Sequence, residues 1–98
     1  MISKVSVTTT ATLCLAATNK LWMILQNQSD TDIYLAFEGT SAVTTDVGAS
    51  PGIKLAAGAS IAFTDDYHRG APLTDAIYAI HGSTGTKALV IHYKPKPV

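Results

Sequence analysis

Three histidines are the first residues of this chain that could do chemistry. His81 and His92 lie on either side of a glycine-containing turn at residues 82–85. Two imidazoles on facing strands could contribute to a zinc site. Their offsets from the turn are unequal, so we do not expect the two rings to be neighbours. We interpret them as surface or interface histidines.

Acid, base and cation also occur together in one short segment, formed by Asp65, Asp66, Tyr67, His68 and Arg69. Such a set could serve acid–base catalysis or bind a cation. Adjacent side chains on a loop point in different directions, however, and no second motif completes a constellation. We therefore expect an exposed loop over residues 65–74, with these residues as a candidate contact loop that touches a partner.

Nucleophile and cofactor motifs are missing from the sequence. There is no Gly-x-Ser-x-Gly elbow, and the glycines at 48, 52 and 58 do not form a phosphate-binding pattern before a helix. The single cysteine, Cys14, excludes an internal disulfide and a multi-thiolate zinc site. We expect a protein without catalytic residues, cofactor or metal.

The elements that would position any site are short β-strands. Runs rich in Val, Ile, Thr and aromatic residues alternate with Gly, Asn, Asp, Ser and Pro, and no helical period appears. The runs are 4–10, 11–17, 20–27, 32–38, 52–55, 59–64, 75–81 and 87–94. This pattern predicts one all-β domain over residues 1–98, a compact β-sandwich or jelly-roll-like barrel of seven to nine antiparallel strands.

Short polar or glycine-containing turns predict that consecutive runs pair as hairpins. We expect 20–27 to pair with 32–38 through the turn at 28–31, and Ile53 and Leu55 to pair with Ile61 and Phe63. A last hairpin joins 75–81 to 87–94. The N-terminal run is an extended segment and not a secretory signal, because its threonines are too polar. The proline-containing tail, 94–98, is predicted to be an extended arm.

The run 20–27 is apolar on both of its faces, which is typical of a central strand or of one that meets a partner. We expect a candidate interface built from Trp22, Ile24, Tyr34, Tyr78, Lys94 and Lys96.

The amino-acid composition is typical of a subunit that assembles with other protein chains. The chain has 98 residues, is 47% apolar, and carries 7 basic and 7 acidic side chains, for a formal charge of zero. Nucleic-acid binding requires a clustered basic excess, and no apolar run is long enough for a membrane span. A small, apolar, uncharged chain is predicted to form a homo-oligomer and to bind other proteins.

The succession LWMILQNQSDTDIYLAF, GIKLAAGASIAF and AIYAIHGSTGTKALVIHY resembles a group of small virion proteins of tailed bacteriophages. The resemblance covers Leu21 to Tyr93. It implies a β-sandwich that decorates or cements the capsid, or serves in the neck or tail, with the major capsid protein or other virion proteins as partners. It also implies a location in the virion, and in the bacterial cytoplasm during assembly.

A ligand-binding module is the alternative function. Aromatic residues and the 65–69 loop, with Tyr67, could bind a host-surface glycan on the virion.

Overall fold

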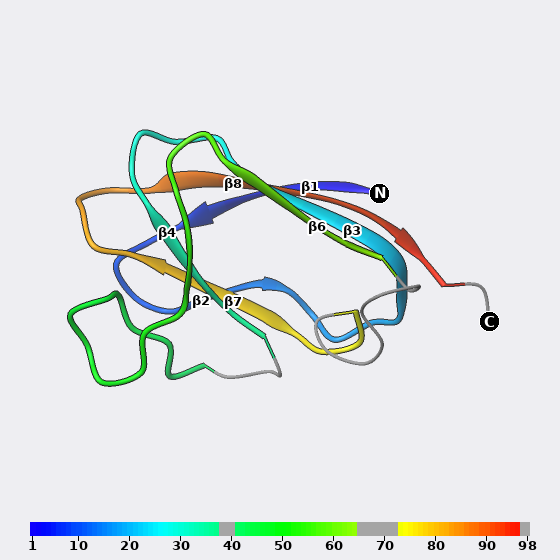
Figure 1. The fold of residues 1–98 in the computed structure, drawn as a ribbon, viewed down its shortest axis with the longest axis horizontal. Coiled ribbons are helices and arrows are strands. Elements are labelled where there is room, and N and C mark those ends of the chain that lie inside the picture. The colour runs from blue at the N-terminus through cyan, green and yellow to red at the C-terminus, as the bar shows by residue number, and fades with distance from the viewer. Residues whose placement is uncertain (38–40, 65–72, 97–98) are drawn as a thin grey trace.

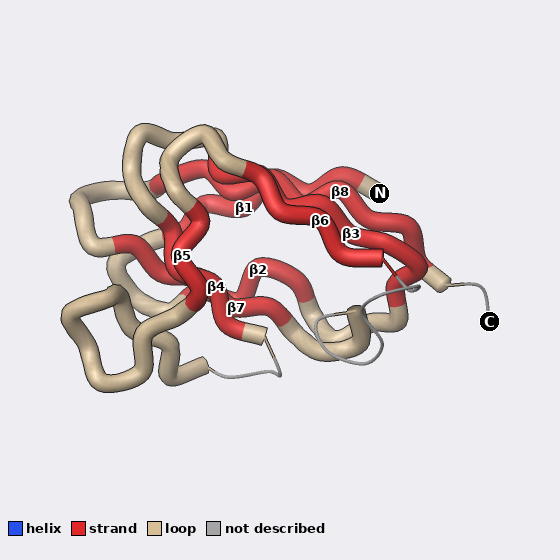
Figure 2. Tube along the Cα trace, in the orientation of Figure 1, coloured by secondary structure: helices blue, strands red, loops and turns tan. Residues whose placement is uncertain are grey.

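Eight β-strands make up the fold in the computed structural model, which describes residues 1–37, 41–64 and 73–96 (Figures 1 and 2). Their bounds are β1 Ile2–Val7, β2 Thr12–Leu15, β3 Lys20–Asn27, β4 Ile33–Ala36, β5 Ile53–Leu55, β6 Ser60–Thr64, β7 Ile77–His81 and β8 Lys87–Pro95. The predicted all-β class is confirmed. Within these residues, no helix is long and apolar enough to span a membrane.

The strands form two four-stranded sheets, which we call sheet A and sheet B. Sheet A has the order β1-β8-β3-β6, and sheet B has the order β2-β7-β4-β5. Antiparallel pairs join β1 to β8, β2 to β7, β3 to β6 and β4 to β5, so the pairing is nested from the ends of the chain inward. Nested pairing of eight strands over two sheets is the strand order of a jelly roll. The predicted sandwich is therefore of the jelly-roll kind.

Inward and outward side chains alternate along the strands, and the inward ones hold the two sheets together. In β3, Met23 and Leu25 are fully buried, and in β8 Leu89 and Ile91 are fully buried, while their neighbours face outward. These inward side chains form one core with residues of sheet B such as Ile33. Removing their apolar surface from water supplies the main driving force for closing the sandwich.

The three predicted hairpins are wrong. Strand β3 lies in sheet A and β4 in sheet B, and the same change of sheet separates β5 from β6 and β7 from β8. Each polar connection is therefore an arch that crosses between sheets. Among consecutive described strands, only β4 and β5 pair with each other. A turn-like composition indicates where the chain reverses, but it does not determine whether the next strand stays in the same sheet.

The predicted N-terminal segment and residues 94 and 95 of the predicted C-terminal arm belong to sheet A. Residues Ile2 to Val7 pair with β8, and Lys94 and Pro95 pair with β3 opposite Trp22 and Lys20. The described part of the predicted extended arm, 94–96, is therefore held against the body of the domain, since the Lys96 backbone N–H also donates to the Asn19 carbonyl at 2.9 Å. Proline ends the ladder at Pro95 instead of preventing it, because it lacks only its own N–H.

Three buried polar residues in the described part of the chain stand at strand ends, where the arches begin. Lys20, Asn27 and His81 are each at most 2% exposed. The Lys20 ammonium donates to the carbonyls of Thr18 and Leu73, and burial lowers its pKa. Each of these residues joins a strand end to a connecting segment, so hydrogen bonds hold the arches in place beside the apolar core.

Residues 44–51, which precede β5, fold back on themselves close to β4. A parallel bridge joins Thr44 to Pro51, and the Thr44 N–H donates to the Ser50 carbonyl at 2.8 Å. Gly52 follows, and a Cβ added there would lie 2.7 Å from the Leu35 carbonyl oxygen. Only glycine allows this close approach to β4. The 44–51 loop is thereby held over one end of sheet B.

Candidate functional site

The outer face of sheet A carries a row of side chains that crosses all four strands. The registers place Ile2 opposite His92, His92 opposite Ile24, and Ile24 opposite Ala62. Ile2 is 69% exposed and Ile24 is 41% exposed. An exposed branched apolar residue in the middle of a sheet is unusual, because burial of a whole isoleucine is worth about 2 kcal/mol. We call this set the sheet A row.

Trp22 extends the row toward one end of the sheet. Its indole meets the His92 ring edge to face, with ring centroids 5.2 Å apart. Lys94 pairs opposite Trp22, and Lys4 lies beyond the row on β1. The outward positions of sheet A carry these two lysines and no carboxylate in the described strands. The face is thus apolar in its middle and weakly positive at its margins.

The structure separates the residues of the predicted interface. Trp22, Ile24 and Lys94 share the outer face of sheet A, whereas Tyr78 alternates with the buried residues of β7 in sheet B. Lys96 is exposed just beyond β8. Tyr34 is only 7% exposed, so it offers little surface to a partner. The candidate contact loop at 65–69 lies outside the described residues.

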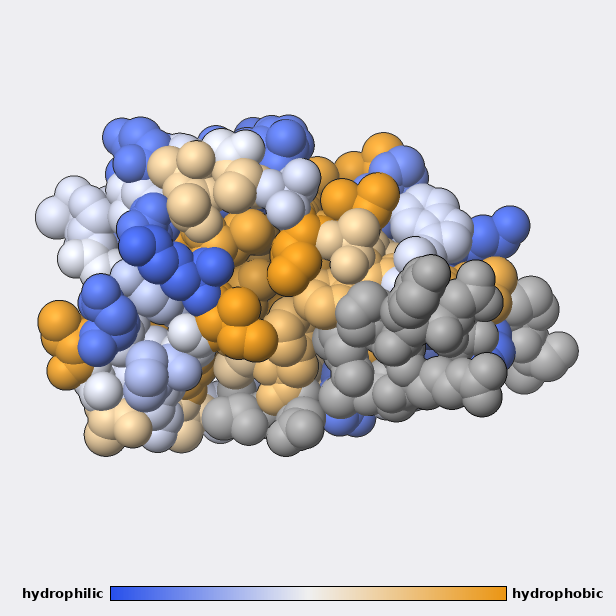
Figure 3. Space-filling view, in the orientation of Figure 1, coloured by the Kyte–Doolittle hydropathy of each residue, from blue (hydrophilic) through white to orange (hydrophobic). Residues whose placement is uncertain are grey.

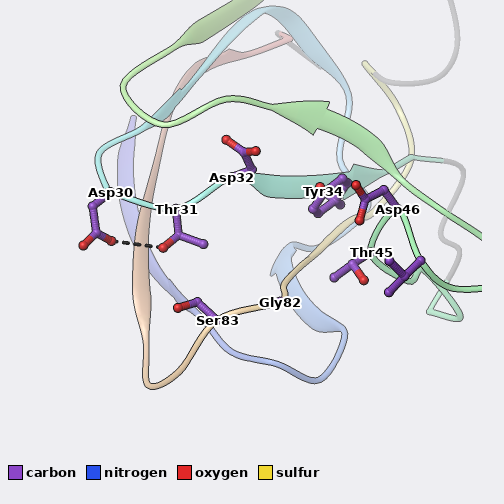
Figure 4. Close-up of a pocket in the computed structure, with 9 residues that line it drawn as sticks. Asp30, Thr31, Asp32, Tyr34, Thr45, Asp46, Gly82 and Ser83 are labelled. Atoms are coloured by element: carbon purple, nitrogen blue, oxygen red, sulfur yellow. Dashed lines mark hydrogen bonds between the residues drawn. The ribbon is translucent and has the colours of Figure 1, made fainter.

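A second candidate feature is an open pocket of about 460 Å³ at one end of the molecule (Figure 4). Three separate stretches of the chain supply its lining: the β3–β4 arch with the adjoining part of β4, the 44–51 loop and the β7–β8 arch. The lining residues are Asp30, Thr31, Asp32, Tyr34, Thr45, Asp46, Val47, Gly82 and Ser83. No sequence motif announces this pocket, because its residues are brought together only by the jelly-roll order.

Carboxylates dominate the electrostatics of the pocket, and two of them have cationic partners. Lys87 donates to Asp30 at 2.9 Å, and Lys54 lies 3.3 Å from Asp32. The bond from Lys87 lowers the pKa of Asp30, and the bond to Asp32 raises the pKa of Lys54. Burial raises the pKa of Tyr34, and the nearby Asp46 carboxylate raises it further. Figure 4 shows Asp46 beside the Tyr34 ring.

The pocket can accept and donate hydrogen bonds but holds no set of metal ligands. No group of three His, Cys, Asp or Glu side chains suited to a metal ion occurs in the described residues. Carboxylate and hydroxyl oxygens around an open hollow are suited to the hydroxyl groups of a sugar or another polyol.

The two C-terminal histidines have different surroundings. His92 is exposed on sheet A, whereas His81 is 1% exposed and faces the core of sheet B, so they are not neighbours. His81 Nδ1 accepts the Ser83 N–H at 3.1 Å, and its Nε2 lies 2.8 Å from the Gly85 carbonyl oxygen. This ring therefore fixes the arch that supplies one wall of the pocket. The expectation of a surface or interface histidine is wrong for His81.

Hydrophobic surface also gathers on the open side of the sandwich between β5 and β6, where Ile53 is 56% exposed (Figure 3).

Comparison with protein-family models, with curated proteins and with solved structures finds no match for this chain.

Proposed function

We propose that this chain is a non-enzymatic assembly subunit that works by burying the outer face of sheet A against neighbouring proteins. The sheet A row is the observation that carries the proposal. A sheet face with exposed isoleucines on β1 and β3 and an exposed alanine on β6 gains free energy when a second surface removes these side chains from water. Adjacent strands of sheet A place the side chains of the sheet A row side by side, so another protein could contact several of them at once.

The neighbours we propose are structural proteins of a tailed-phage particle, with the chain placed on the capsid, neck or tail. Two arguments support this assignment. The sequence resembles small virion proteins of tailed phages, and eight-stranded jelly rolls recur in viral shells. The same fold also serves unrelated functions, so the fold alone does not decide. On this proposal the chain is made in the bacterial cytoplasm and functions in the virion.

Substitution of the row tests the proposal. Ile24→Asp places a charge in the middle of the outer face and should abolish cosedimentation with purified particles of a phage that encodes the chain. Ile53→Asp is the matched control, since it introduces the same change at an exposed isoleucine of sheet B. Both variants should keep the β-sheet circular dichroism spectrum. Equal particle binding by the two variants, or a gene outside any phage genome, would contradict the proposal.

A glycan-binding module is the second candidate, favoured by the pocket of carboxylates and hydroxyls. Asp46 has no ion-pair partner among the described residues, and its carboxylate lies beside the Tyr34 hydroxyl, so the two side chains could bind a sugar hydroxyl together. Asp46→Ala should then weaken binding on a glycan array about tenfold, as expected for loss of one charged hydrogen bond. Asp75→Ala is the control, because Asp75 does not line the pocket, and it should leave glycan binding unchanged. A blank array for the wild-type chain rejects this candidate.

A further inference from the structure

Strand β1 leaves one edge of sheet A open. Strand β8 pairs with one side of β1, and no described strand pairs with the other side. The six residues of β1 keep a continuous register and contain no proline. The edges of sheet B are less suited to pairing, because β2 has a register shift between Leu13 and Leu15 and β5 has only 3 residues. A long regular edge is a template for another strand.

The hydrogen bonds at the start of β1 show which backbone groups point to this open edge. Met1 and Tyr93 exchange both backbone hydrogen bonds, so they form a hydrogen-bonded pair of the antiparallel ladder. Such pairs alternate along the strand. Ser3, Val5 and Val7 therefore bond to β8, and the N–H and C=O groups of Ile2, Lys4 and Ser6 point away from it. A second strand would satisfy these three residues together, in place of water.

We propose that β1 pairs antiparallel with β1 of a second copy, across a two-fold axis that joins two copies of sheet A into one continuous sheet. This contact deepens the proposed assembly function, on which it rests, by naming one of its interfaces. A second copy is the occupant because the strand complements itself. Small or β-branched residues line its inward side, and the outward side carries a single charge, on Lys4.

The two faces of the sheet restrict the register of this pair. Directly opposed residues in an antiparallel pair lie on the same face, so odd-numbered residues must oppose odd-numbered ones. One such register places Lys4 opposite Lys4 of the second copy, which like-charge repulsion disfavours. The next places Val5 opposite Val5, with Lys4 opposite Ser6. We assign the second register, in which both Lys4–Ser6 pairs are hydrogen-bonded.

The assigned register also continues features that the single copy already has. Val5 packs only partly against the core, and opposition to its copy covers its remaining surface. The sheet A row, which ends at Ile2 on the open edge, would continue across the axis. Two copies would therefore present one longer apolar face to a third partner, which agrees with the symmetric interfaces of most small oligomers.

Cross-linking tests the register. Opposed residues that are not hydrogen-bonded have Cα atoms about 4.5 Å apart, within the range of a disulfide. Val5→Cys should therefore form a covalent dimer when its thiols are oxidised with oxidised glutathione. Ser6→Cys on the same strand is the control, because Ser6 opposes Lys4 and not itself. Cys14 is buried and stays reduced in both variants. Equal cross-linking of the two variants overturns the register.

Sedimentation equilibrium tests the dimer itself. The wild-type chain should be a dimer at micromolar concentration, and Ser6→Pro should be a monomer. Proline removes an N–H that points to the open edge, while Val5 and Val7 keep their bonds to β8. Ser6→Ala keeps the N–H and should remain a dimer. A wild-type monomer that binds phage particles through Ile24 would overturn this interface alone, whereas a β1-paired dimer that binds no particle would overturn the proposed function alone.

Discussion

Asn27 shows how one side chain can hold two arches. It is fully buried at the end of β3, and its amide nitrogen donates to the carbonyls of Thr31 at 2.8 Å and Leu55 at 2.9 Å. Its amide oxygen accepts both the N–H and the hydroxyl of Ser29. Every polar atom of the side chain is therefore used. Asparagine is suited to this position because it has two donors and an acceptor on a short stem.

Replacement of Asn27 by alanine should lower the free energy of unfolding by about 3 kcal/mol, because buried partners lose their hydrogen bonds. Chemical denaturation measures the change. Gln26→Ala is the control, because the neighbouring Gln26 side chain is exposed and hydrogen-bonds only with the side chain of Gln28. This variant should change the free energy of unfolding by less than about 0.5 kcal/mol. A similar loss in both variants would show that the buried amide has no special part in the arches.

Cys14 is expected to be inert while the chain is folded. The residue is 8% exposed, and burial raises the pKa of its thiol to about 12. At pH 8 the thiolate that reacts with alkylating agents is therefore nearly absent. Mass spectrometry should show no iodoacetamide adduct on the native chain and complete modification in denaturant. Rapid labelling of the native chain would mean that the edge of sheet B at β2 opens readily.

At the scale of the element, strand positions could be predicted and strand partners could not. Alternation in residues 20–27 identifies β3 and its inward residues, because burial of every second side chain is a local requirement. The turns at 28–31 and 82–85 have the composition of hairpin loops. Whether they stay within a sheet is set by distant pairing, such as that of β3 with β6 and β8.

The candidate functional residues divide in the same way: the outward positions of one strand could be predicted, and contacts between distant segments could not. Trp22 and Ile24 could be assigned to an outward face, since they alternate with buried residues of one strand. Tyr34 has the same pattern in sequence, but the 44–51 loop contributes to the pocket beside it, and the tyrosine is buried. The pocket could not be predicted, because the three stretches that line it are far apart in the chain.

The β7–β8 arch depends on a left-handed glycine. Gly85 has φ of 69°, and a Cβ added there would meet nothing within 4 Å. Gly85→Ala should therefore cost only backbone strain, about 1–2 kcal/mol in thermal or chemical unfolding. Gly85→Asn should cost less, because asparagine tolerates this conformation. An asparagine variant no more stable than the alanine variant would contradict this reading of the arch.

At the scale of the whole molecule, the ion pair of Asp30 with Lys87 makes stability depend on pH. The pKa of Asp30 is lowered in the folded state, so the folded chain binds this proton less readily than the unfolded chain. The contribution is present above the unfolded value of about 3.9 and is lost as the pH falls below it.

Unfolding midpoints measured from pH 6 down to pH 2 should therefore fall, and Asp30→Asn should make the decline shallower. Lys87→Met should have the same effect, because it removes the donor that lowers the pKa. Salt should weaken the dependence, since Asp30 is exposed. If both variants decline as steeply as the wild-type chain, the acid sensitivity originates from other carboxylates.

Nested pairing has a last consequence for chain connectivity. Met1 bonds to Tyr93, so β1 begins and β8 ends toward the same pole of the molecule, as Figure 1 shows. A short linker could close the backbone into a ring, and a cut between Ser83 and Thr84 would then create new ends at the opposite pole. Such a circular permutant keeps every strand pair while reversing the direction in which a fused cargo would project.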